Sequence, residues 1–299
     1  MSTISFRALT KSYGRVRAVN DLSFDVQPGK VTGFLGPNGS GKTTTLRILL
    51  GLASPTSGTA TISGLTYRQL RDPVREVGAS LDNNVFHPGR SAAQHLRVIT
   101  TATNLPRRRV DDVLGLVGLS DVAGQVVGGF SLGMRQRLSL AAALLGDPGV
   151  LIFDEPLNGL DPDGIRWIRG LLRSLAAQNR TVLLSSHLLS EVAQTVDDVV
   201  VISQGRLVAV STLAELAERT SLVRIRTSDA SRLLDVLTAA GVQVRLVDDS
   251  TVEAPSASAE AVGLAAAEAG VPILELSRED QDLESLFFDL IHQNKEIAA

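Results

Sequence analysis

The run Gly36–Thr43, which reads Gly-Pro-Asn-Gly-Ser-Gly-Lys-Thr, has the spacing G-x-x-x-x-G-K-[ST] of a phosphate-binding loop. Its glycines allow consecutive backbone N–H groups to close around phosphate oxygens, and the helix predicted from Thr43 presents its positive end to the same anion. Lys42 is expected to reach the outer phosphates, and the Thr43 hydroxyl is expected to ligate Mg²⁺. The alternative is a glycine-rich turn that holds a lysine by chance. The predicted nucleotide-binding residues of this segment are Gly36, Pro37, Asn38, Gly39, Ser40, Gly41, Lys42, Thr43 and Thr44.

Two adjacent acidic residues, Asp154 and Glu155, follow the apolar residues of the segment Val150–Asp154, which is predicted to be a buried strand. Asp154 is suited to hold Mg²⁺, directly or through water, and Glu155 to orient or deprotonate an attacking water. His187 follows another predicted strand, Thr181–Ser185, and is expected to contact Glu155 or the γ-phosphate. Ligands bind at the edge of a parallel sheet where such strands end. The alternatives are a solvated strand end or helix cap for the acids and a structural role for the histidine.

A second anion site is predicted at the start of the helix Ser131–Gly146. The Ser131 hydroxyl and the flexible Gly133 lie at the positive end of this helix. A chain that already has one phosphate-binding loop offers no obvious second phosphate for this site. As the alternative, Ser131 serves only as an N-cap.

The composition of the 299 residues describes a soluble globular chain, with 44% apolar and 20% charged residues. Its 29 Lys and Arg nearly balance 32 Asp and Glu, which excludes a polycation that coats nucleic acid. The absence of cysteine excludes disulfides and thiolate sites, and 4% aromatic residues argue against base stacking as the main activity. We predict no transmembrane helix, and the N-terminus lacks an apolar signal core. The chain is therefore expected in the cytosol.

Residues 1–219 alternate short β-branched runs with helical patterns, which is typical of an α/β domain with a largely parallel sheet. The first of its buried strands is expected at Val31–Leu35. An N-terminal antiparallel sheet is expected from Ile4–Leu9 and Val16–Val26, and a hairpin from Val199–Ile202 and Leu207–Val210.

Residues 220–299 are expected to form a small accessory domain with the ferredoxin-like order βαββαβ. Two of its helices are predicted to end at glycines. The expected elements are strand Leu222–Thr227, helix Ser231–Ala240, strands Val242–Val247 and Thr251–Ala254, helix Ala257–Ala269 and strand Ile273–Leu276, followed by an amphipathic helix at Leu283–Ile291.

The ordered motifs of residues 1–219 resemble the ATP-binding subunit of an ATP-binding cassette (ABC) transporter. Besides the phosphate-binding loop, Phe130–Arg137 resembles the family signature Leu-Ser-Gly-Gly-Gln, and Asn158–Asp161 resembles the loop after the acidic strand. His187 matches the switch histidine, and Tyr13 matches the aromatic residue on which adenine stacks. The resemblance implies a P-loop ATPase with an N-terminal antiparallel β subdomain and a helical subdomain.

The resemblance also implies partners and a function. Two ATP-binding subunits, identical or different, would pair head to tail, so that Ser131 and Gly133 contact the γ-phosphate held by the opposing subunit. Together they would hydrolyse ATP with Mg²⁺ on the inner face of the cell membrane and drive a separately encoded permease, without nucleic acid. The signature and the C-terminal extension resemble systems that export drugs, antibiotics or lipids. Alternatives are an importer subunit with a solute-sensing C-terminal domain, a soluble cassette ATPase and a non-hydrolysing regulator. The presence of Glu155 and His187 argues against the non-hydrolysing regulator.

Two departures from the family pattern stand out. Leu132 and Met134 replace the second signature residue and the usual glutamine. In the loop Val77–Asn84, where relatives carry a glutamine near Mg²⁺, Asp82 takes that place and is predicted to be an auxiliary metal ligand; Asn83 or Asn84 could instead supply an amide. The segment that follows, Phe86–Ser91, is by resemblance the region that receives a short helix of the membrane subunit, although Phe86 and His87 could equally be ordinary loop anchors.

Overall fold

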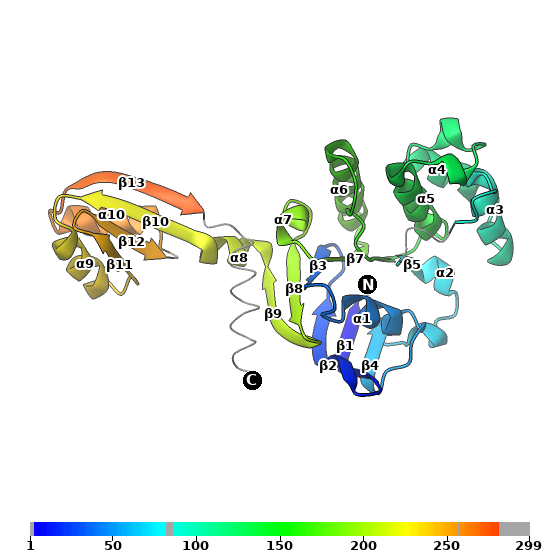
Figure 1. The fold of residues 1–299 in the computed structure, drawn as a ribbon, viewed down its shortest axis with the longest axis horizontal. Coiled ribbons are helices and arrows are strands. Elements are labelled where there is room, and N and C mark those ends of the chain that lie inside the picture. The colour runs from blue at the N-terminus through cyan, green and yellow to red at the C-terminus, as the bar shows by residue number, and fades with distance from the viewer. Residues whose placement is uncertain (1–2, 82–85, 256, 281–299) are drawn as a thin grey trace. The chain divides into compact units, whose positions relative to one another are not determined.

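The computed structural model describes residues 3–81, 86–255 and 257–280 (Figure 1). The chain forms two compact units, Met1–Val210 and Ser211–Ala299. The boundary expected between residues 219 and 220 lies beyond this division and stays a prediction. Among the described residues, no helix is both long enough and apolar enough to cross a membrane.

A six-stranded sheet with the order β5-β6-β7-β3-β8-β9 forms the centre of the first unit. The strands from β5 to β8 pair in parallel, so the carboxyl ends of β3, β6 and β7 meet at one edge. The strand bounds are β3 (Val31–Leu35), β5 (Val77–Ser80), β6 (Val150–Phe153), β7 (Thr181–Ser186), β8 (Asp198–Ser203) and β9 (Arg206–Thr212). The three predicted central strands and the hairpin are confirmed. Val77–Ser80, expected as part of a loop, is instead a strand.

A three-stranded antiparallel sheet with the order β2-β1-β4 accompanies the larger sheet. It consists of β1 (Ile4–Tyr13), β2 (Val16–Val26) and β4 (Ser57–Ile62). The sequence predicted β1 and β2 but missed β4. A Cβ at Gly58 would lie 2.2 Å from the carbonyl oxygen of Ala8, so β4 uses this glycine to approach β1 closely.

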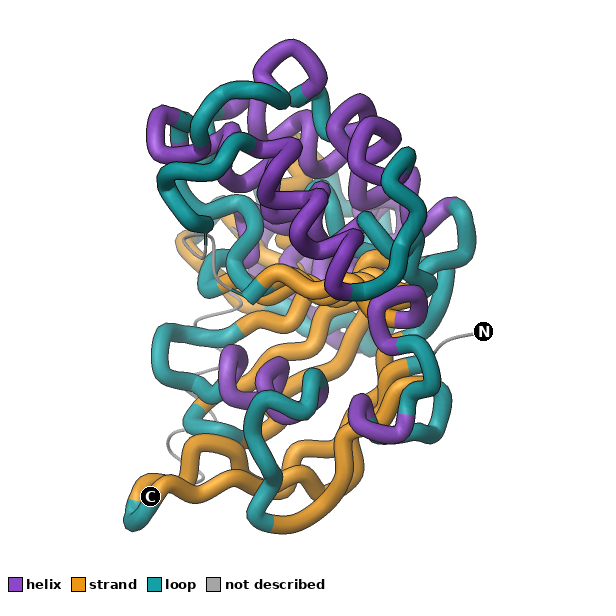
Figure 2. Tube along the Cα trace, turned by 90° about the vertical axis from the view of Figure 1, so that its right-hand side faces the viewer, coloured by secondary structure: helices purple, strands orange, loops and turns teal. Residues whose placement is uncertain are grey.

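Helices α3 to α6 lie on one side of the six-stranded sheet and α1 lies on the other (Figures 1 and 2). Helix α6 packs on β7 and β3, while α5 packs on β5 and α4. The bounds are α1 (Lys42–Leu49), α2 (Pro73–Glu76), α3 (Ala92–Ala102), α4 (Arg109–Leu116), α5 (Leu132–Leu144), α6 (Pro162–Ala177) and α7 (Leu189–Val192), with short 3₁₀ helices at Tyr67–Gln69, Ser120–Val122 and Val127–Gly129.

Three phenylalanines in contact join the two sheets of the first unit. The ring centroids of Phe6 and Phe24 are 4.5 Å apart, and those of Phe24 and Phe34 are 5.3 Å apart. All three rings are buried in one apolar core with residues of β6, β7 and β8. This core fixes β3, and therefore the loop that leaves it, relative to both sheets.

The second unit has the predicted order βαββαβ, and its antiparallel sheet has the order β11-β12-β10-β13. Strand β11 is shorter than predicted, because Val242 donates its backbone N–H to Leu237 O and closes helix α9. The bounds are α8 (Leu213–Thr220), β10 (Ser221–Thr227), α9 (Ala230–Ala239), β11 (Arg245–Asp248), β12 (Thr251–Pro255), α10 (Ala259–Glu268) and β13 (Ile273–Asp280). The predicted helix Leu283–Ile291 lies outside the described residues.

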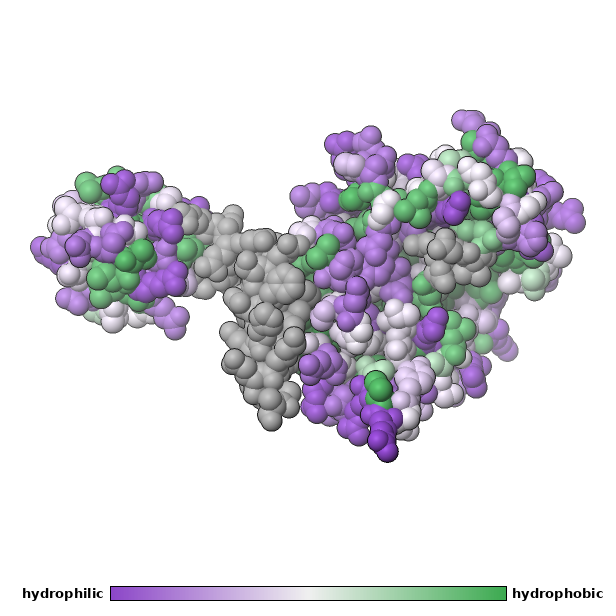
Figure 3. Space-filling model, in the orientation of Figure 1, coloured by the Kyte–Doolittle hydropathy of each residue, from purple (hydrophilic) through white to green (hydrophobic). Residues whose placement is uncertain are grey.

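The visible surface in Figure 3 is mixed in hydropathy. Hydrophilic residues prevail, and the hydrophobic ones form small separate patches.

Candidate nucleotide site

The loop between β3 and α1 has a backbone that its glycines make possible. Gly41 is the N-cap of α1 with φ 106°, and a Cβ there would lie 2.4 Å from the carbonyl oxygen of Ala18. A Cβ at Gly36 would lie 2.4 Å from the carbonyl oxygen of Ile202. Any side chain at these positions would displace the loop. With glycine there, the loop keeps its backbone N–H groups at the start of α1, where they can bind an anion.

Two buried polar side chains of this loop fit a phosphate ligand. The Ser40 hydroxyl is buried and has no hydrogen-bond partner in the structure, and an unpaired buried hydroxyl is costly unless a ligand satisfies it. The Lys42 side chain is 6% exposed, and its Nζ donates to the carbonyl oxygen of Gly36 at 2.6 Å. A hydroxyl and an ammonium at the start of a helix match the chemistry of a bound polyphosphate.

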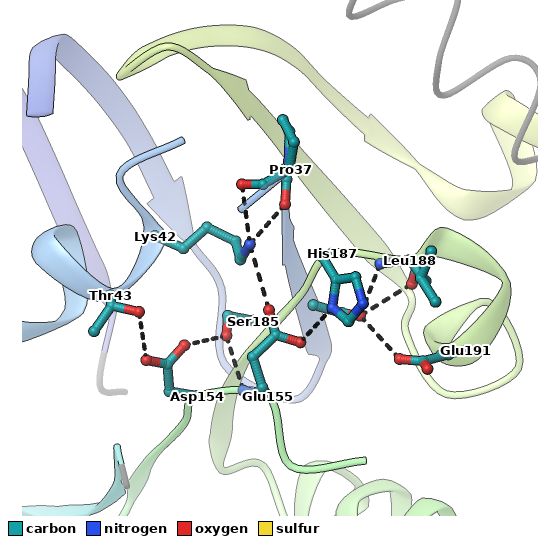
Figure 4. A network of polar contacts seen from close by, with 11 residues as sticks. Pro37, Lys42, Thr43, Asp154, Glu155, Ser185, His187, Leu188 and Glu191 are labelled. Atoms are coloured by element: carbon teal, nitrogen blue, oxygen red, sulfur yellow. Dashed lines mark hydrogen bonds and ion pairs between the residues drawn. The ribbon is translucent and has the colours of Figure 1, made fainter. Parts of the chain in front are cut away.

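The Asp154 carboxylate receives two hydroxyl hydrogen bonds beside the loop. Thr43 Oγ1 donates to Asp154 Oδ2 at 2.7 Å, and Ser185 Oγ donates to Asp154 Oδ1 (Figure 4). Thr43 and Asp154 therefore offer Mg²⁺ the hard oxygen ligands that it prefers. No cluster of three His, Asp or Glu side chains suited to a metal occurs in the part of the chain that the structure describes. A Mg²⁺ ion held by Thr43 and Asp154 would take its other ligands from water and phosphate.

The Glu155 carboxylate lies between a lysine and a histidine, as Figure 4 shows. Its Oε1 is 3.3 Å from Lys42 Nζ, and its Oε2 is 3.0 Å from His187 Nδ1. The structure thus brings together side chains that follow β3, β6 and β7. The predicted contact between His187 and Glu155 is present in this geometry.

The sequence did not single out Ser185, which organises both acidic residues. Its Oγ bonds the Asp154 carboxylate and also accepts the backbone N–H of Glu155 at 2.9 Å. Phe153 pairs with Leu184 in the parallel ladder, so Ser185 comes next to Asp154. The sequence signal that could have identified Ser185 was a serine at the polar end of an apolar strand.

The predicted second anion site lies at the start of α5, away from this network. Ser131 is the N-cap of α5, and its Oγ accepts the backbone N–H of Met134 at 3.2 Å. Together with Gly133, it lines a cavity of about 330 Å³ between α5 and α6. Among the described residues, no hydrogen bond or ion pair joins Ser131 or Gly133 to the phosphate-binding loop.

Of the two remaining predicted residues, the structure describes Tyr13 and not Asp82. Tyr13 ends β1 with 51% of its surface exposed, and the Lys11 ammonium lies 4.8 Å from its ring centroid. An exposed ring of this kind is free to stack on a base. Asp82, the predicted auxiliary metal ligand, lies outside the described residues, as do Asn83 and Asn84.

A groove of about 540 Å³ opens next to β5 and is lined mostly by apolar and aromatic side chains. The rings of Phe86 and His95 meet edge to face with centroids 4.9 Å apart. Burial, with the positive charge of Arg90, lowers the pKa of His95, which favours its neutral form. The lining residues are Arg47, Leu50, Leu52, Tyr67, Ala79, Ser80, Leu81, Phe86, His95, Ser139 and Ala142.

Several known proteins and one family model are similar to this chain. Residues 19–158 match the family described as ABC transporter, and residues 220–284 match a domain of unknown function, DUF8746. The chain is 44% identical over 211 residues to the bacitracin transport ATP-binding protein BcrA of Bacillus licheniformis, covering 69% of each chain. It is 32% identical over 299 residues to the uncharacterized ABC transporter ATP-binding protein YcbN of Bacillus subtilis, covering 97% of each.

A solved structure described as the ATP binding subunit of an ABC transporter has the same fold. It superposes with a TM-score of 0.64 and 28% identity over 71% of this chain and 91% of that one. The fold, the convergent polar network and the relatives agree with the resemblance that the sequence motifs indicated. This chain belongs to the ATP-binding subunits of the ABC transporter family.

Proposed function

We propose that this chain hydrolyses MgATP as one half of a head-to-tail pair of subunits and drives a separate membrane permease that exports a drug, an antibiotic or a lipid-like compound. The observation that carries the proposal is the network in which Glu155 lies between Lys42 and His187 while Thr43 bonds Asp154. It joins a phosphate-binding group, a metal-binding pair and a general base at one sheet edge.

In this proposal the loop and the metal pair hold the triphosphate. The loop N–H groups, the Ser40 hydroxyl and Lys42 bind phosphate oxygens, and Tyr13 stacks on adenine. Thr43 and Asp154 hold Mg²⁺, which neutralises charge on the phosphates when it is bound. Ser185 fixes the Asp154 carboxylate from the neighbouring strand. The Asp154 carboxylate is thus held in position before ATP binds, as electrostatic catalysis requires.

Glu155 acts as the general base. Its carboxylate accepts a proton from a water molecule as the water oxygen attacks the γ-phosphorus, and the bond from that phosphorus to the bridging oxygen of ADP breaks. His187 holds the Glu155 carboxylate through Nδ1. The rest of the His187 ring would contact the γ-phosphate. A base that is fixed in this way contributes about 10²–10⁴-fold to the rate.

Dimerisation completes each site. Ser131 and Gly133 lie at the start of α5 and line the cavity between α5 and α6, and this helix start would contact the γ-phosphate bound by the opposing subunit. ATP would close the pair and hydrolysis would reopen it. The departures at Leu132 and Met134 leave the serine, the later glycine and the helix start in place.

The groove beside β5 is the proposed docking site for the permease. Its apolar floor and the Phe86 and His95 rings suit the apolar face of a short helix. Docking there would keep the chain on the inner face of the membrane. Export is favoured over import because the signature form and C-terminal extension resemble efflux systems, and the relative BcrA is a bacitracin transport protein. Residues 220–299 would act as an accessory domain beyond the ATPase domain.

The proposal is tested by ATP turnover and by copurification. The chain is expected to hydrolyse ATP and to copurify with a membrane protein when both are expressed together. Lys42→Ala is expected to abolish productive ATP binding or turnover, because it removes the buried ammonium at the loop. Lys30→Ala, which removes an exposed lysine that pairs with Asp198 instead of the loop, is the matched control. Normal turnover in Lys42→Ala would refute the site, and copurification with ribosomes instead of a membrane protein would refute the transport role.

A further inference from the structure

Glu155 has a backbone conformation that few residues with a side chain adopt. Its φ is 51°, in the left-handed region. Strain of this kind persists only where surrounding groups hold it, and it is concentrated at functional sites. Groups that hold the Glu155 backbone therefore also set the direction of its carboxylate.

Two buried polar side chains hold this segment from opposite sides. On the amide side, Ser185 Oγ accepts the Glu155 N–H at 2.9 Å. On the carbonyl side, Gln136 Nε2 donates to the carbonyl oxygen of Pro156, the next residue, at 2.8 Å. The two tethers come from different elements, β7 and α5.

Gln136 is unusual for a core residue because only one end of its amide is satisfied. The side chain is 1% exposed, and Oε1 has no hydrogen-bond partner in the structure. Leaving a buried acceptor unpaired is costly, and an apolar side chain of the same size would avoid that cost. The hydrogen bond from Gln136 Nε2 to Pro156 is therefore the reason that this buried position holds a polar side chain.

Gln136 belongs to the same helix as the signature residues. Helix α5 begins directly after its N-cap Ser131 and contains both Gly133 and Gln136. A movement of the helix start would thus be passed by Gln136 to Pro156 and from there to Glu155.

We infer that Gln136 is a positioning residue that couples the signature helix of a subunit to the catalytic glutamate of the same subunit. The inference rests on the proposed function, because it requires Glu155 to be the base and Ser131 to meet the nucleotide of the opposing subunit. Through this tether, contact of the signature with one nucleotide adjusts the base that acts on the other. Gln136 acts through Pro156 and touches neither substrate nor metal.

The first test separates positioning from folding. Gln136→Met keeps the volume and removes the donor to Pro156. Its kcat is expected to fall at least about tenfold, while the ATP concentration for half-maximal turnover stays within about twofold. Arg109→Met is the matched control, because Arg109 also holds helix α5 through hydrogen bonds, but at its other end, where it donates to the carbonyl oxygens of Leu144 and Leu145. It is expected to keep kcat within about twofold.

The same substitution is then combined with Glu155→Gln. If Gln136 acts through Glu155, Gln136→Met with Glu155→Gln forms as much ATP-bound dimer as Glu155→Gln alone. Unchanged kcat in Gln136→Met would overturn the inference, and so would loss of the ATP-bound dimer in the combined variant, because that loss would mean a general defect of the signature helix.

Gln136→Glu provides a readout that packing alone would not move. Burial raises the pKa of the introduced carboxyl, and only its protonated form can donate to Pro156. Turnover relative to the unmodified chain is expected to rise at least about threefold from pH 8 to pH 6; a ratio that does not change with pH would overturn the inference. If the unmodified chain does not hydrolyse ATP, the proposed function fails. If it does and Gln136→Met is fully active, only this inference fails.

Discussion

His187 Nδ1 lies 3.0 Å from Glu155 Oε2, and this contact joins the ends of two adjacent parallel strands. The other carboxylate oxygen of Glu155 is 3.3 Å from Lys42 Nζ. One carboxylate therefore connects the phosphate-binding loop with the histidine, and its direction depends on both. We therefore predict that His187 affects the rate of hydrolysis more than the affinity for ATP.

Replacing His187 tests that relationship. His187→Ala is expected to lower kcat about 10²-fold, because Glu155 loses the group that holds Oε2, while ATP affinity changes only a few-fold. Steady-state ATPase kinetics and equilibrium nucleotide binding measure the two effects. Glu191→Gln is the control, since the Glu191 carboxylate contacts Ser186 instead of Glu155. Equal losses of kcat and affinity in His187→Ala would speak against a role in positioning.

The metal role of Asp82 is a separate prediction. Asp82→Ala is expected to raise the Mg²⁺ concentration needed for half-maximal hydrolysis several-fold, because an auxiliary carboxylate ligand is lost. Titration of ATPase activity with Mg²⁺ measures this, with Asn83→Ala and Asn84→Ala tested in parallel. A shift in one of these two variants but not in Asp82→Ala would assign the position to an amide instead.

The C-terminal unit is expected to be dispensable for nucleotide binding. It has its own apolar core, built from residues of β10, α9, β12 and α10 such as Val223, Leu233, Val252 and Val262. A chain that ends at residue 219 is therefore expected to fold and bind ATP within about twofold of the full chain, since every predicted nucleotide contact lies before that residue. Equilibrium binding and thermal unfolding check this. A truncated chain that folds but does not bind ATP would show that the proposed domain boundary is wrong.

Motifs whose chemistry is local could be predicted from the sequence. The glycine spacing of Gly36–Thr43 dictates a loop geometry by itself, and the acids after Val150–Phe153 could be placed because parallel strands end at one edge. The antiparallel strands β1 and β2 could be predicted from their alternation. These features depend on neighbours within a few residues, so the chain shows them directly.

Features that depend on distant partners could not be predicted. The left-handed Glu155 is held by Ser185, 30 residues away in sequence, and by Gln136, which bonds Pro156 across 20 residues. Strand β4 was missed because glycine at position 58 is explained only by the close approach of β4 to β1 in the folded chain. Strand β5 was interpreted as loop because its short run, Val77–Ser80, is buried only once β6 and α5 pack against it. In each case tertiary contact overrides a weak local pattern.

The central claim is that each subunit needs its mate to finish an ATP site, and Ser131 allows a direct test. Since Ser131 is the N-cap of α5, Ser131→Asp keeps a good cap but places a negative charge where the γ-phosphate of the opposing subunit would lie. The measurement is the mass of Glu155→Gln in saturating MgATP by light scattering, with and without Ser131→Asp. We predict a dimer for Glu155→Gln and a folded, ATP-binding monomer when Ser131→Asp is added. An equally stable dimer in both would contradict the account.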